Sequence, residues 1–167
     1  EVSEVEQEVF LSPAPYATEV SIYLNGVEID EEEITYGNTY TFKIKVLGEN
    51  PDEDPDAEDF IAIAGLQLYA NIGVYSEDYS IVVDGNEYTY GEHENIKLRS
   101  KTDSEGIVEF TLSIPEDDPD IEEEFSIVIC ASKDGDFMIY SYNFYSPSKP
   151  AIELMPDEDL NFVDYNL

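Results

Sequence analysis

Two acidic segments of the chain hold the side chains best able to do chemistry. Both contain prolines, which keep the backbone out of regular strands and helices. Their carboxylates are Asp52, Glu53, Asp54, Asp56, Glu58 and Asp59 in residues 48–59, and Asp117, Asp118, Asp120 and Glu122, with Glu123 beside them, in residues 115–124. Ca²⁺ binds about six to eight oxygen ligands, and a divalent cation relieves the repulsion between crowded carboxylates. The two segments are therefore candidate calcium-binding loops.

A second interpretation of these segments stays open. Neither has the D-x-D-x-D-G spacing of an EF-hand calcium loop. The whole chain is acidic, with 40 Asp and Glu against 7 Lys and Arg and a formal net charge of -33. Blocks of like charge are often only solvating, so both segments also fit solvated loop tips on a protein adapted to high salt.

Catalytic chemistry is poorly supported. His93 is the only histidine, and Glu92 and Glu94 flank it in a polar stretch that predicts an exposed surface side chain. A zinc site built from several histidines is excluded within one chain, and no phosphate-binding glycine loop is present. The chain has no Trp for stacking on a sugar. We therefore expect a protein that is not an enzyme and has no catalytic residues.

Charge and cysteine content limit the classes of binding partner and the cellular compartment that fit this chain. The acidic surface opposes binding to nucleic acid or to an anionic membrane. No apolar run approaches the roughly 20 residues of a membrane span. Cys130 is the single cysteine, so an intrachain disulfide is excluded and a buried thiol is expected. The chain begins with Glu1 instead of Met, which favours a processed extracellular protein or an excised fragment.

The elements that must position the acidic segments are all strands. Alternating apolar and polar residues, separated by turn formers such as Asn25-Gly26, predict about eight to ten strands. The run from Phe60 to Ala64 is dense enough for a strand buried on both faces, and Gly65 or Gly73 could mark a bulge. This is the pattern of an all-β sandwich, immunoglobulin-like or jelly-roll, over residues 19–146. Strands are expected at 19–24, 27–29, 38–47, 60–75, 79–83, 86–90, 95–99, 106–114, 125–131 and 136–146.

The stretch from Lys101 to Pro115 is a tight turn followed by a half-buried strand. Its residues from Thr102 to Leu112 have the pattern T-D-x-x-G-x-a-x-F-x-L. This pattern resembles a segment of the immunoglobulin-like repeats in invasin-type adhesins and other microbial surface proteins. The resemblance covers about a dozen residues. It implies an immunoglobulin-like strand order, in which the two acidic segments lie at opposite ends of the sandwich.

Hydrophobic arms flank the sandwich, at residues 1–18 and 147–167. Pro13 and Pro15 separate the first arm from the body, and its apolar residues alternate with glutamates. Such a segment can add a strand to a neighbour's sheet, and repeated head-to-tail donation grows a filament or a ring. The alternative is a frayed terminus, or an edge strand of the chain's own sheet. The candidate subunit-contact residues are Val5, Val9, Phe10 and Leu11, or Ile152 and Leu154 in the second arm.

Together these features predict a structural subunit of an extracellular filament or tubule, assembled from copies of itself by strand donation and by calcium between acidic loops. This organisation is similar to that of donor-strand filaments on microbial surfaces, including pili and the calcium-requiring cannula tubules of some archaea. The first alternative is a monomeric calcium-binding adhesin module of a cell-surface protein. The second is a secreted domain whose charge only solvates it in high salt.

Overall fold

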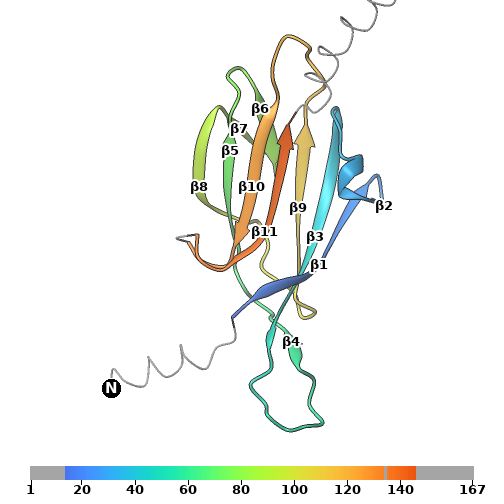
Figure 1. Cartoon of the computed structure of the whole chain (residues 1–167), viewed down its shortest axis with the longest axis vertical. Coiled ribbons are helices and arrows are strands. Elements are labelled where there is room, and N and C mark those ends of the chain that lie inside the picture. Colours follow the sequence, from blue (N-terminus) through green and yellow to red (C-terminus); the bar gives the residue numbers. More distant parts are fainter. Residues whose placement is uncertain (1–13, 134, 146–167) are drawn as a thin grey trace, which may run out of the picture.

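The computed structural model describes residues 14–133 and 135–145, which form two packed antiparallel sheets (Figure 1). The predicted all-β sandwich is confirmed. One three-residue 3₁₀ turn, η1, is the only helical element among these residues. The strands are β1 (Tyr16–Leu24), β2 (Val27–Ile29), β3 (Asn38–Glu49), β4 (Phe60–Ala62), β5 (Tyr69–Val74), β6 (Ser80–Val83), β7 (Asn86–Thr89), β8 (Gly91–Lys97), β9 (Ile107–Ile114), β10 (Glu124–Cys130) and β11 (Met138–Tyr145), with η1 (Glu31–Glu33) between β2 and β3.

The strand order contains that of an immunoglobulin-like sandwich, with four added strands. One sheet has the order β2-β1-β3-β9-β6-β7, with β4 also paired to β3, and the other has the order β11-β10-β5-β8. The path β1-β3-β9-β6 facing β11-β10-β5 corresponds to strands A-B-E-D facing G-F-C of the immunoglobulin type. The added strands are β2, β4 and β7 in the first sheet and β8 in the second, and β8 returns to the second sheet after the β6–β7 hairpin. The immunoglobulin-like prediction fits this order better than the jelly-roll alternative.

The core lies between the central strands β3 and β9 and the opposite sheet. Phe42 of β3 and Phe110 of β9 are register partners, and their rings stack with centroids 4.8 Å apart. Both side chains are buried, as are the other residues of β3 and β9 that share their inward face. On the solvent face of the same pair, the Lys43 ammonium lies 3.6 Å from the Glu109 carboxylate. The alternation in the sequence predicted both faces because a strand repeats every two residues.

The turn before β9 is fixed by Asp103 and Gly106. The Asp103 carboxylate accepts the backbone N–H groups of Glu105 and Ile107 at 2.8 and 2.9 Å. These bonds hold the pKa of Asp103 below its usual value. Gly106 has a φ of +78°, and a Cβ there would lie 2.5 Å from the Val46 carbonyl oxygen. The residue types of the T-D-x-x-G pattern are therefore required by backbone geometry.

Thr102 fixes the chain that follows the first acidic loop. Its buried hydroxyl donates to the Ile63 carbonyl at 2.6 Å and accepts the Leu66 N–H at 2.8 Å. Its backbone pairs with Gly65 and Leu66 at 2.8 and 3.0 Å. The base of the acidic loop is thereby anchored to the sandwich.

Several details differ from the sequence predictions. β1 begins at Tyr16, inside the predicted arm of residues 1–18, β8 is Gly91–Lys97 where 95–99 was predicted, and the predicted strand 60–75 is divided into β4 and β5. The run from Phe60 to Ala64 is not a doubly buried strand, since β4 has three residues and the Phe60 side chain is 45% exposed against Tyr16. β4 lies at the end of the sandwich, where the second sheet does not cover it (Figure 1). Register shifts lie in the β1–β3, β10–β11 and β5–β8 pairings, not at Gly65 or Gly73. In the β5–β8 pairing, Asn95 takes a φ of +59° and donates its N–H to the Asn71 side chain at 2.9 Å.

The chain enters and leaves the sandwich at opposite ends. β1 begins at the end where β4 lies, and β11 finishes at the other end (Figure 1). The loop between β3 and β4 and the loop between β9 and β10 are separated in the same way. The expected placement of the two acidic segments is therefore confirmed. Cys130 is buried, as predicted.

Candidate functional site

The first acidic loop, between β3 and β4, is organised by its own side chains. Asn50 closes its base, with its N–H bonded to the Asp59 carbonyl and its side-chain amide bonded to the Glu58 carbonyl, both at 2.8 Å. From there the side-chain oxygen of each alternate residue accepts the N–H two residues on. The three bonds join Asn50 to Asp52, Asp52 to Asp54, and Asp54 to Asp56, each at 3.0 Å.

This ladder reveals a pattern that the sequence analysis missed. Asp52, Asp54 and Asp56 have the D-x-D-x-D spacing that begins an EF-hand loop, but Ala57 stands where that loop has glycine and Ile63 where it has the bidentate glutamate. The signal was available in the sequence, where only the crowding of carboxylates had been noted. The loop residues surround a concavity of about 430 Å³, and the acidic side chains on it are exposed.

The second acidic loop, between β9 and β10, is built differently. Asp118 accepts the Asp120 N–H at 3.0 Å through its carboxylate, and its own N–H is donated to Glu123 at 3.3 Å. Glu123 is only 1% exposed, so it turns into the fold and differs from its acidic neighbours in the loop. Its charge adds to burial in raising the pKa of Tyr79. Glu123 is thus a structural carboxylate, whereas Asp117, Asp118, Asp120 and Glu122 remain at the surface of the loop.

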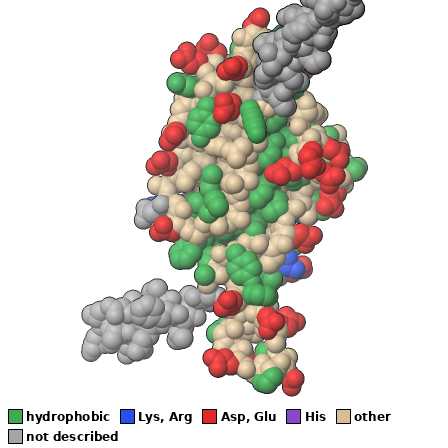
Figure 2. Space-filling view, viewed as in Figure 1, with side chains coloured by type: hydrophobic (Ala, Val, Ile, Leu, Met, Phe, Trp, Pro, Cys, Tyr) green, Lys and Arg blue, Asp and Glu red, His purple; other side chains and the backbone are tan. Residues whose placement is uncertain are grey.

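The structure does not bring the two sets of candidate ligands together within one copy. They occupy opposite ends of the sandwich, where groups of acidic side chains are visible at the surface (Figure 2). Across residues 14–133 and 135–145, no three carboxylate, histidine or cysteine side chains are arranged around one potential metal position. An ion shared between copies would need a loop from each.

The two long sides of the sandwich differ. On one side β7 and β8 face each other, and the His93 ring packs on Tyr88 with centroids 5.3 Å apart while its Nε2 lies 2.9 Å from the Thr89 carbonyl oxygen. His93 was predicted to be exposed, but it is half-buried, because it alternates with Glu92 and Glu94 and points toward the other sheet. A hollow of about 220 Å³ lies on the same side, between Tyr88 of β7 and Ile96 of β8.

The other long side, between β1 and β11, carries a groove among the residues that the structure describes. A groove of about 580 Å³ runs beside the last part of β11, and residues 31–34 form its other wall. Hydrophobic side chains reach the surface between β11 and the acidic η1 turn (Figure 2). The Tyr140 hydroxyl donates to the Glu31 carboxylate at 2.9 Å across the gap. Burial, and then Glu31, raises the pKa of both Tyr140 and Tyr142.

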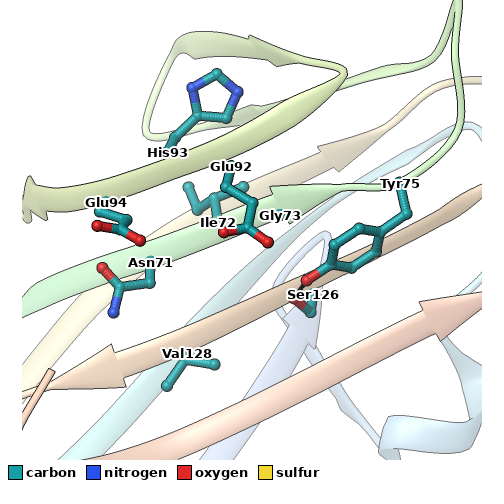
Figure 3. Close-up of a pocket in the computed structure, with 9 residues that line it drawn as sticks. All are labelled: Asn71, Ile72, Gly73, Tyr75, Glu92, His93, Glu94, Ser126 and Val128. Carbon is teal, nitrogen blue, oxygen red and sulfur yellow. Dashed lines mark hydrogen bonds between the residues drawn. The ribbon is translucent and has the colours of Figure 1, made fainter.

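A small surface pocket lies on the outer face of the second sheet (Figure 3). The Tyr75 ring lies over Gly73, where a Cβ would come within 2.3 Å of the Tyr75 hydroxyl oxygen, and this hydroxyl bonds to the Ser126 hydroxyl at 2.8 Å. Glu92 and Glu94 border the pocket from β8. Tyr75 fills the space that Gly73 leaves, so the feature is explained by packing.

The predicted contact residues of the two arms lie outside the described residues. These are Val5, Val9, Phe10, Leu11, Ile152 and Leu154. What the structure describes is the surface that such residues could meet, namely the strand edges of the body.

Comparisons with known proteins add no relative. No protein-family model, no curated protein and no solved structure matches this chain. In residues 14–133 and 135–145, no helix has the length and hydrophobicity needed to cross a bilayer.

Proposed function

We propose that this protein is a structural, non-enzymatic subunit of an extracellular filament or tubule, assembled from copies of itself by β-strand donation and by calcium between acidic loops. The observation that carries the proposal is that the two ends of the sandwich differ and that the chain runs from one to the other. The chain enters at one end and leaves at the other, and each end presents an acidic loop (Figures 1 and 2). Copies stacked in one orientation place unlike acidic loops against each other.

Such a contact depends on cations. Carboxylates from two copies repel at short range, and a Ca²⁺ ion with ligands from both loops converts that repulsion into a bridge. The first loop offers Asp52, Asp54 and Asp56 in a spacing that suits calcium, and the second offers Asp118 and Asp120. A heterologous contact of this kind does not close into a dimer and leads to an open polymer.

The test is assembly of the full chain with and without calcium. We expect large particles by light scattering, and filaments or tubes by electron microscopy, at micromolar protein with Ca²⁺. They should be absent with chelator and after deletion of residues 1–12. A chain that stays monomeric under every ionic condition would refute the proposal.

A charge-matched pair of variants separates calcium from general screening. The triple variant Asp52→Asn, Asp54→Asn and Asp56→Asn should lose calcium-dependent assembly. The control, Glu87→Gln, Glu92→Gln and Glu94→Gln, removes the same charge from exposed positions outside both loops. This control should keep calcium-dependent assembly. If both sets behave alike, or if NaCl at matched ionic strength replaces Ca²⁺, the acidic surface only solvates the protein.

The alternative is a calcium-binding adhesin module within a longer cell-surface protein. Entry and exit at opposite ends also favour tandem modules on one chain (Figure 1). Such a module remains a monomer, and Ca²⁺ raises its melting temperature without large particles forming.

A further inference from the structure

We propose that the outer edge of β11, together with the groove beside it, is the acceptor site for residues 4–11 of a second copy. This inference rests on the proposed function and assigns the surface at which strand donation occurs. Added to β11, the incoming segment lies between this strand and residues 31–34, and it takes the place of the Tyr140–Glu31 hydrogen bond that crosses this gap.

Comparison of the strand edges selects β11. β2 has three residues and β7 has four, which are too short to pair with a donated segment of about eight. The outer edge of β1 is covered by β2 only over Ile22–Leu24, but its register with β3 shifts between Ala17 and Glu19. β8 is longer, but the bulge at Asn95 interrupts its regular register. β11 is an edge of its sheet and has eight residues. Its pairing with β10 shifts register between Met138 and Tyr140 but is regular over residues 140–145, so these six residues present a regular row of backbone groups on the free side.

The surroundings of β11 fit a strand with one apolar face. Ile34, Tyr142 and Phe144 line the groove together with Glu31 and Glu32. The inward apolar side chains of the donor would lie against the first three. Three of the large hydrophobic side chains exposed in the described residues are on β11 or directly before it. They are Phe137, Met138 and Tyr145, at 56%, 61% and 58% exposure. A strand added along β11 would cover exposed apolar surface at both ends of this edge.

The donor segment has the complementary pattern. Val5, Val9 and Leu11 share one face when the segment is extended, and this face matches the groove. Its glutamates face the other way, toward the outer surface of the sheet. There the neighbouring β11 side chains, Ser141 and Asn143, are uncharged.

The position of the groove indicates a donor from another copy. The groove lies along residues 141–145, at the end where β11 finishes, whereas the N-terminal segment joins β1 at the end where β4 lies (Figure 1). In a head-to-tail stack, the β4 end of one copy meets the groove end of the next. The donated segment then runs in the same direction as β11, and each copy donates to one neighbour and accepts from the other.

Disulfide trapping between separately tagged chains tests this assignment. In a Cys130→Ala background, one chain carries Asn143→Cys and the other carries Glu6→Cys or Glu8→Cys. The matched control replaces Asn143→Cys with Glu87→Cys, an exposed position on β7, on the opposite long side. Trapping should favour Asn143→Cys by roughly 100-fold, because a bound segment has a millimolar effective concentration against tens of micromolar in free solution.

The outcomes separate this inference from the proposed function. Equal trapping at both positions, or none at Asn143→Cys while the wild-type chain still assembles, overturns the β11 site and leaves the filament proposal standing. A double variant, Glu8→Cys with Asn143→Cys, that crosslinks only within one chain shows that the segment fills its own groove, which overturns donation at this site. Preferential trapping from Glu153→Cys would assign the groove to the C-terminal segment and overturns the choice of donor.

Discussion

Thr102 provides the sharpest test of how the first acidic loop is held. Its hydroxyl bonds to both the Ile63 carbonyl and the Leu66 N–H, and its side chain is buried. The substitution Thr102→Val keeps the shape and removes both bonds. The two backbone groups of the segment after β4 would then lack their partner.

The expected cost follows from these two bonds. An unsatisfied buried donor or acceptor costs about 1–3 kcal/mol. Because both groups are only partly buried, we expect Thr102→Val to lower the free energy of unfolding by about 2–4 kcal/mol. The control Thr102→Ser keeps the hydroxyl and loses one methyl group, which costs about 1 kcal/mol.

Urea denaturation followed by far-UV circular dichroism measures both changes, and tyrosine fluorescence offers a second probe, because the chain has no Trp. A loss of about 3 kcal/mol corresponds to a fall of roughly 6–12 °C in Tm for a chain of this size. Protease cleavage in residues 48–62 should also accelerate for Thr102→Val and not for Thr102→Ser. If valine is tolerated as well as serine, the hydroxyl does not anchor the loop, and the account of the T-D-x-x-G pattern given above is wrong.

Three further predictions follow from particular residues. Gly106→Ala should destabilise the fold by at least about 1 kcal/mol more than Gly26→Ala in denaturant titrations, because both have positive φ but only the first places a Cβ against backbone; equal effects would contradict this. Burial raises the pKa of Tyr140 and Tyr142, so the folded state holds their protons more tightly than the unfolded chain, and the free energy of unfolding should fall as pH rises above about 10. A free energy of unfolding that stays constant up to pH 12 would refute this prediction. Burial raises the pKa of the Cys130 thiol, so alkylation should be slow in the native state and should accelerate on denaturation; fast native labelling would show an accessible thiol.

The sequence predicted the sandwich well, because alternation reports directly which face of a strand is buried. The paired strands β3 and β9 followed from the alternation of Phe42 and Phe110 with polar residues. The stacking of the Phe42 and Phe110 rings depends on the register between β3 and β9, which the pattern of one strand does not predict. Opposite placement of the acidic loops followed from the immunoglobulin-like strand order.

Other features depended on contacts that no local pattern encodes. Phe60 lies in an apolar run, but the loop before it carries it to the end of the sandwich, where it packs on Tyr16. The half-burial of His93 depends on β8 returning to the second sheet beside β7. In the first acidic loop, the ladder through Asp52 and Asp54 could have been recognised from the alternate spacing. The open groove beside β11 is invisible in sequence, because its walls come from segments about a hundred residues apart.

The bulge at Asn95 has a consequence for the form of any polymer. It interrupts β8 as a pairing edge. If β11 is the one edge that accepts a segment, each copy takes up a single incoming chain, and growth proceeds as unbranched threads of uniform width. Thickening into bundles would then use the outer faces of the sheets.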